Sequence, residues 1–186
     1  MTPHRLPPRI FALIIGINEY ESPNIVNMVG AVADADAMQY YLQSHLGVPS
    51  SQIRNLRNSE ATRAAIIDGI KAFSLNFEVK EGDPILIYYA GHGGSADTPK
   101  GWEVGSTGKI SFLIPYDYSS PLNDVNGSHT HGIPNRTLGV LLSRLSAEKG
   151  DNIVRQTFIL WVYLSTNYVI DSHPRLFSLR FWHRKL

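Results

Sequence analysis

Two continuous apolar runs dominate the pattern of hydrophobic and polar positions along the chain. The first covers residues 9–17 and has a glycine at position 16; the second covers residues 84–90. A strand that is buried on both faces of a parallel sheet has this pattern, because neither of its faces needs polar side chains. Proline at the first position of the second run is tolerated there. Both runs are therefore predicted to be central strands.

Three other segments carry apolar residues at three- and four-residue spacing, which is typical of amphipathic helices. We expect helices over residues 32–46, over a stretch that begins after Thr62 as its N-cap, and over residues 136–149. The predicted buried stripes are Ala35, Met38, Leu42 and Leu46 in the first, Ile66, Ile70, Phe73 and Phe77 in the second, and Leu138, Leu141, Leu142 and Leu145 in the third.

Shorter apolar stretches at residues 52–56 and 110–114 predict two more strands, and the alternation of strands with helices predicts an α/β fold with a parallel sheet. We expect residues 91–108 to form a glycine-rich loop, followed after the last short strand by a long polar loop that contains His129 and His131. In parallel sheets, sites form at the carboxyl ends of the strands. The loop after the second apolar run is therefore the expected position of a site.

Composition limits the classes of function. The 186 residues have a net charge of +1, which gives no electrostatic case for a nucleic-acid partner. The longest apolar stretch, residues 157–170, is too short and too polar for a transmembrane segment, and the first nine residues lack the apolar core of a secretory signal. We expect one cytoplasmic domain. The absence of cysteine excludes disulfides, thiolate metal sites and thiol chemistry, and the residues suggest no metal site.

The sequence Tyr-Ala-Gly-His-Gly-Gly at residues 89–94 is the candidate chemical motif. It places His92 directly after a buried strand. Imidazole acts as a general base near neutral pH, and the flanking glycine amides can line an oxyanion hole. A loop histidine without a catalytic role is the alternative. His-Gly-Gly also occurs in the oxyanion loop of esterases, but the Gly-x-Ser-x-Gly motif of those enzymes is absent, as is a phosphate-binding Gly-Lys-Ser/Thr.

Several ordered segments resemble the caspase domain of clan CD cysteine peptidases, peptidase family C14, and most closely its metacaspase-like branch. The matching segments are residues 11–18, 30–35, 46–49, 61–62, 82–83, 87–93 and 113–117. The resemblance extends from residue 9 to residue 153. It implies a caspase-like three-layer α/β sandwich with a mostly parallel sheet, here incomplete at the C-terminus. The expected organisation is an N-terminal extension (1–8), the caspase-like part (9–153) and a divergent tail (154–186).

The resemblance assigns roles to individual residues. It makes His92 the catalytic histidine and places the Gly93 amide in the oxyanion hole. Asp34 occupies the position of an acidic residue in the pocket for the P1 side chain, where a carboxylate favours Arg or Lys. The alternative, which we favour, is an acidic residue that complements a helix dipole. The resemblance also implies peptide or protein substrates and allows calcium as a cofactor.

The catalytic cysteine of the family is missing. After the last predicted helix, a strand should end in Asp-x-Cys-His-Ser-Gly or a close variant, with the cysteine near residues 158–160. Residues 154–161 contain no acid, cysteine or histidine, and Ser165 lacks the glycine context of a nucleophile. Without a thiolate the covalent mechanism has no first step. We therefore expect an inactive relative of a cysteine endopeptidase or, alternatively, a pseudopeptidase that acts as a decoy or interaction partner of intact relatives.

The tail from Val154 has two candidate origins, a retained intron or frame error and a genuinely divergent end. Its stretch at residues 157–164 is β-prone and is a candidate substitute for the missing strand. The basic and aromatic residues 175–186 fit either a membrane-surface helix or a loosely docked terminus.

Overall fold

The computed structural model describes residues 8–98, 108–119 and 129–161, and of residues 158–161 the backbone alone. Within these residues one sheet runs in the order β2-β1-β3-β4-β5, and β6 also pairs with β3. Its strands are β1 (Phe11–Gly16), β2 (Ile53–Arg57), β3 (Ile85–Asp97), β4 (Lys109–Leu113), β5 (Ile133–Pro134) and β6 (Ile153–Trp161). Strands β2, β1, β3 and β6 are mutually parallel, whereas β4 is antiparallel to both β3 and β5.

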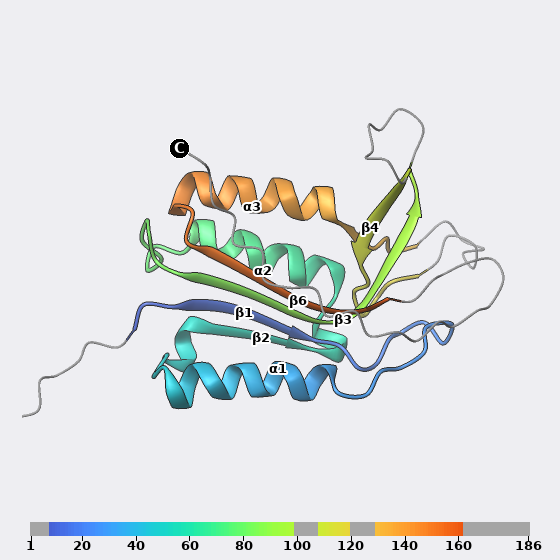
Figure 1. Ribbon diagram of the computed structural model, residues 1–186, viewed down its shortest axis with the longest axis horizontal. Coiled ribbons are helices and arrows are strands. Elements are labelled where there is room, and N and C mark those ends of the chain that lie inside the picture. Colours follow the sequence, from blue (N-terminus) through green and yellow to red (C-terminus); the bar gives the residue numbers. More distant parts are fainter. Residues whose placement is uncertain (1–7, 99–107, 120–128, 162–186) are drawn as a thin grey trace, which may run out of the picture.

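Three α-helices cover the two faces of this sheet. They are α1 (Ala31–Tyr40), α2 (Arg63–Leu75) and α3 (Asn135–Lys149). Helix α1 lies on one face, and α2 and α3 lie together on the other, so that the domain has three layers (Figure 1). Each face has its own apolar core, and all six residues of β1 are buried between the two. The predicted α/β sandwich with a mostly parallel sheet is confirmed.

The glycine at the end of the first apolar run permits close packing between β1 and α1. A Cβ atom at Gly16 would lie 2.7 Å from the Cβ of Ala35 and 2.9 Å from the carbonyl oxygen of Ala31. Real Cβ contacts are not this short, so a larger residue would push α1 away from the sheet. Gly16 therefore sets how closely the N-terminus of α1 approaches the carboxyl end of β1.

The predicted helical stripes pack on the core, except at the last positions of the first two helices. Leu46 is 39% exposed, because α1 passes into a π-helical turn (Tyr41–His45) that changes the helical phase, and Val48 is buried after it. Phe77 is 89% exposed, because α2 ends at Leu75. The predicted N-cap of α2 is confirmed: the Thr62 side chain accepts a hydrogen bond from the Ala65 amide at 3.2 Å.

The predicted glycine-rich loop after residue 90 is wrong in its first part. Strand β3 continues to Asp97 and forms a hairpin-like pair with β4, in which Gly93 lies opposite Leu113 and Asp97 opposite Lys109. The glycines do not break the strand, because β4 supplies new ladder partners where β1 ends. The polar loop was also predicted without regular structure, yet Ile133 and Pro134 form the short strand β5 beside β4.

The beginning of the divergent tail adds a strand to the sheet. Strand β6 starts at Ile153, one residue before the expected boundary, and pairs in parallel with β3 from Ile85 to Gly93. The expectation that tail residues add a strand to the sheet is confirmed, but the strand starts at Ile153 rather than at residue 157. Residues 162–186, with Ser165 and the basic segment 175–186, lie outside the described part of the chain, as do residues 1–7.

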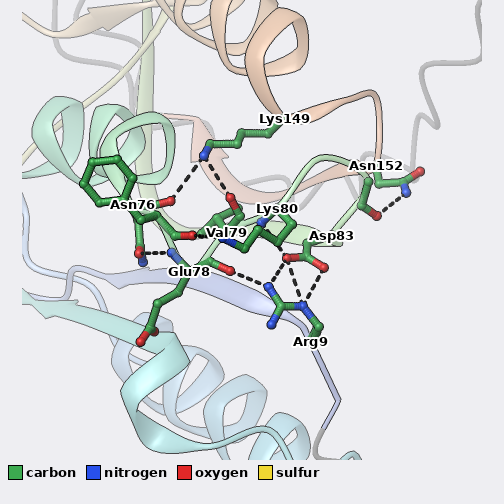
Figure 2. A network of polar contacts seen from close by, with 10 residues as sticks. Arg9, Asn76, Glu78, Val79, Lys80, Asp83, Lys149 and Asn152 are labelled. Carbon is green, nitrogen blue, oxygen red and sulfur yellow. Dashed lines mark hydrogen bonds and ion pairs between the residues drawn. The ribbon is translucent and has the colours of Figure 1, made fainter.

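A polar network at the end of the sheet where β1, β3 and β6 begin holds the start of β6 in place (Figure 2). The Lys149 ammonium donates to the carbonyl oxygens of Val79 at 2.8 Å and Asn76 at 3.2 Å. The side-chain amide of Asn152 donates to the Gly82 carbonyl at 2.6 Å, and the Asn152 carbonyl accepts from the Ile85 amide at 2.9 Å. These contacts connect the end of α3 to the loop before β3, and they set the register in which β6 enters the sheet.

The same network contains an ion pair between Arg9 and Asp83, which connects the residues before β1 to the residues before β3. The Arg9 guanidinium lies 2.6 Å from one Asp83 carboxylate oxygen, and its Nε donates to the other at 2.9 Å. Asp83 also accepts from the Lys80 amide at 2.7 Å. The hydrogen bond from Arg9 holds the pKa of Asp83 below its ordinary value.

No helix among the described residues is long and apolar enough to cross a membrane.

We predict that Asp83→Asn lowers the free energy of unfolding at neutral pH. Because the folded-state pKa of Asp83 is depressed, its contribution to stability is present above the ordinary aspartate pKa and is lost as pH falls through the folded-state value. Urea unfolding across the acid range should therefore show a weaker pH dependence in the variant than in the unmodified chain. Asp68→Asn, which removes an exposed i,i+3 pair with Lys71, is the matched control. Equal pH profiles for both variants would contradict the prediction.

Candidate functional site

His92 lies where strand β3 changes neighbours along one of its edges. The ladder with β1 ends with the bond from the Ile17 amide to the Ala90 carbonyl, at 3.0 Å. The ladder with β4 begins with the bond from the Ile114 amide to the His92 carbonyl, also at 3.0 Å. Gly93 pairs with both β4 and β6, so β4 must occupy the side of β3 that β1 has left. His92 is thus at the carboxyl end of the β1–β3 pair, as predicted, but inside a continuing strand.

The amide of His92 falls in the gap between these two ladders, and a tyrosine side chain satisfies it. The Tyr20 hydroxyl accepts this amide proton at 2.8 Å, and the Tyr20 ring stacks on the imidazole with centroids 5.0 Å apart. Tyr20 comes from the loop that connects β1 to α1. This loop covers the histidine, whose exposed fraction is 3%.

The same loop fixes the ring of His92. The imidazole Nε2 lies 2.7 Å from the carbonyl oxygen of Val26. A carbonyl oxygen only accepts, so Nε2 must carry a proton and donate it. In the neutral ring the basic lone pair is then on Nδ1. The general-base role of His92 stays a prediction, and in that role Nδ1 is the basic atom.

Tyr89, which lies in β3, forms a cluster with Tyr20 and His92 around the end of the β1 ladder. Its hydroxyl lies 2.8 Å from the carbonyl oxygens of His92 and Ile114. Burial raises the pKa of Tyr20 and of Tyr89 well above that of a free tyrosine, so both hydroxyls keep their protons. Both tyrosines therefore act as neutral hydrogen-bonding groups near neutral pH.

Gly91 has a packing role rather than a role in flexibility. A Cβ atom at this position would lie 2.7 Å from the Tyr89 hydroxyl oxygen and 3.3 Å from that of Tyr20. The residue before the histidine must therefore be glycine for the two tyrosines to meet beneath the strand. At Gly91, one of the two glycines expected to line an oxyanion hole, the structure shows close internal packing.

Gly93, assigned by resemblance to the oxyanion hole, lies within β3. It is opposite Leu113 on one side and Trp161 on the other. The bond from the Ile85 amide to the Asn152 carbonyl shows that odd-numbered residues of β3 direct their amides toward β6. By this alternation the Gly93 amide faces the backbone of β6. The oxyanion role of Gly93 stays a prediction, and it requires β6 to leave that amide accessible.

Asp34 lies exposed in the first turn of α1, at the same end of the sheet as His92. Its amide donates to the Gly30 carbonyl at 2.8 Å. Burial, with an added contribution from the Asp34 charge, raises the pKa of Tyr88 to about 12. The carboxylate is thus within electrostatic reach of β3. Its position agrees with a helix N-terminal acid, and its role in a P1 pocket stays a prediction.

Strand β6 lies where the nucleophile should approach the histidine. Leu160 is the residue of β6 that is in register with His92, and Phe158 is in register with Ala90. Neither position, nor any other in the 186 residues, is a cysteine. Within the described residues, no three His, Asp or Glu side chains gather as ligands for a metal ion. Calcium dependence therefore stays a prediction that no described cluster supports.

The family model of the caspase domain, peptidase family C14, matches residues 9–141. This chain belongs to the caspase-domain family. The match covers both central strands and the His92 segment, and it ends within α3. The expected relationship is confirmed at this level, and β6 lies beyond the matched region.

Solved structures agree with this caspase-domain fold. The crystal structure of protein GSU0716 from Geobacter sulfurreducens superposes with a TM-score of 0.58 at 20% sequence identity. The comparison covers 86% of this chain and 52% of the other, so this chain spans about half the length of that relative. A search of curated proteins finds no match.

Sequence reasoning identified His92 but missed the residues that hold it. Tyr20 and Val26 lie 72 and 66 residues before the histidine, in a loop whose composition indicated only polarity. The apolar run that contains Tyr89 was assigned wholly to the core. One signal could have pointed to Tyr20: the buried His92 amide lies beyond the end of β1, so it needs an acceptor from another part of the chain.

We predict that Gly91→Ala destabilises the domain by about 1–3 kcal/mol, because the added methyl group overpacks the tyrosine cluster. Urea unfolding measures the change. Tyr89→Phe in the same chain removes the oxygen that the methyl group would meet, so it should lessen the effect of the alanine. Gly139→Ala in α3, where a Cβ would have no neighbour within 4 Å, is the control and should be neutral or stabilising. Equal effects at the two glycines would contradict the prediction.

Proposed function

We propose that this caspase-domain chain performs no thiol-dependent peptide hydrolysis and acts instead through binding. The observation that supports this proposal is the identity of β6. This strand pairs with β3 past the position of His92, and it contains no cysteine. His92 is held by hydrogen bonds with Tyr20 and Val26, while the strand beside it contains no cysteine for an imidazole to activate.

The chemistry supports the same conclusion. A Cys/His peptidase needs a thiolate to attack the carbonyl carbon and an imidazole to transfer the proton. In enzymes whose catalytic groups act as a unit, removal of the nucleophile lowers kcat by about 10⁶-fold. A histidine that lacks its nucleophile therefore leaves no efficient route to an acyl intermediate.

We predict that the purified chain hydrolyses neither Arg-P1 nor Asp-P1 peptides above the rate of buffer, with and without calcium. His92→Ala should leave this background unchanged, because the histidine has no nucleophile to activate. A cysteine-bearing caspase-domain protease in the same assay verifies that the substrates are competent. Turnover that disappears in His92→Ala would overturn the proposal.

The outer edge of β6 supports a binding role with intact relatives. Within the described residues β6 pairs with β3 alone. The bond from the Ile85 amide to the Asn152 carbonyl means that even-numbered residues of β6 bond to β3 and odd-numbered ones point outward. The outward amides of Arg155 and Thr157 can therefore pair with an added strand, as in β-augmentation. The same proposal takes the partner to be a metacaspase-like relative, and it assigns Asp34 to the binding, without cleavage, of a basic side chain.

We predict that the tagged chain captures a cysteine-bearing caspase-domain protein encoded by the same genome, and that Thr157→Pro abolishes this capture. Proline removes an outward-facing amide without removing a bond to β3. Thr157→Val keeps the amide and should capture as well as the unmodified chain. Capture that is absent, or that survives the proline, would exclude this edge as the binding surface.

A further inference from the structure

Tyr20 stands out among the residues around the site because it contacts both the backbone and the ring of His92. Its hydroxyl accepts the His92 amide proton at 2.8 Å, and its ring stacks on the imidazole at an interplanar angle of 26°. No other described side chain has both of these contacts with the histidine. Tyr20 is 8% exposed, so these contacts are made away from bulk water.

The need for this side chain arises from the sheet. Along one edge of β3, the carbonyl of Ala90 receives the last bond of the β1 ladder, and the carbonyl of His92 receives the first bond of the β4 ladder. The intervening amide of His92 has no strand opposite it. A buried amide without an acceptor would be costly, and Tyr20 supplies the acceptor that the backbone does not.

The loop that carries Tyr20 also carries Val26, whose carbonyl accepts from Nε2 of the same histidine at 2.7 Å. This loop is fixed internally by the Asn27 side chain, which accepts from the Tyr20 amide at 3.2 Å, and by the bond from the Met28 amide to the Asn18 carbonyl at 2.7 Å. The positions of Tyr20 and Val26 are therefore coupled. We expect a change at the Tyr20 hydroxyl to alter the distance between the imidazole and the Val26 carbonyl.

We propose that Tyr20 is the positioning residue of His92: by occupying the gap between the two ladders, it holds the covering loop at the distance that fixes the Nε2–H tautomer. The Tyr89 hydroxyl holds the His92 carbonyl at 2.8 Å, and Gly91 leaves room for both tyrosine hydroxyls. The role concerns the geometry and tautomer of the ring, and it does not depend on whether the chain hydrolyses peptides.

The test is Tyr20→Phe, which keeps the stacked ring and removes only the hydroxyl. Two-bond ¹H–¹⁵N NMR spectra of the imidazole should show a single Nε2–H tautomer in the unmodified chain. In the variant they should show a tautomer mixture, with a shifted pH titration of His92. The His92 amide should also exchange with solvent about tenfold faster, as expected for the loss of one buried hydrogen bond. His92→Gln identifies the histidine signals.

Tyr118→Phe is the matched control, since Tyr118 is a second buried tyrosine, stacked on Phe112 with centroids 6.0 Å apart. It should leave the tautomer of His92 unchanged. If Tyr20→Phe lowers stability but leaves the tautomer and titration as in the unmodified chain, Tyr20 is only a core residue and the proposal fails.

A measurement on the unmodified chain keeps the proposal testable if Tyr20→Phe does not fold. The His92 amide should then exchange as slowly as the amides of Tyr88 and Ala90, which belong to the regular ladder of β3. Exchange at the rate of an exposed loop amide would mean that the Tyr20 hydroxyl does not hold it, and the proposal would be overturned.

Discussion

The structure depends on one constraint: strand β3 is longer than the neighbour that pairs with its first half. Strand β1 supports it through Ala90, and β4 takes over from His92. A single backbone amide is left between the two ladders, and it belongs to the histidine. The need to satisfy this buried group explains why a loop with a tyrosine folds over the end of β1 and why a glycine precedes the histidine.

This constraint also explains which parts of the molecule could be predicted from sequence. The strands around residues 11–16 and 85–90 follow from uninterrupted apolar runs, and α2 follows from its periodicity and the Thr62 cap. These features are local. The continuation of β3 through Gly93 is not local, because it depends on β4, which is more than ten residues away. Glycines that favour a loop in isolation form a strand when a partner strand satisfies their backbone.

The site divides in the same way. His92 could be found because a motif carries it, whereas Tyr20 and Val26 contact it only after the β1–α1 loop has folded over the end of the sheet. The phase change at the π-helical turn after Tyr40 is likewise invisible to a regular helical pattern, and it left Leu46 exposed instead of buried. Pattern reasoning fails where the geometry of one element is decided by another element.

The two ends of β3 have different relations to β6. At the start, Asn152 and Lys149 fix the strand by contacts with the residues before β3, within or close to the part that resembles the family (Figure 2). At the other end, β6 meets the histidine segment with residues unrelated to the family motif. The contacts of Lys149 and Asn152 thus determine where the following strand runs. The tail supplies enough β-prone residues to occupy that position. The fold needs a strand there; only the chemistry needs a cysteine. For this reason the caspase-domain architecture persists in a chain that lacks the nucleophile.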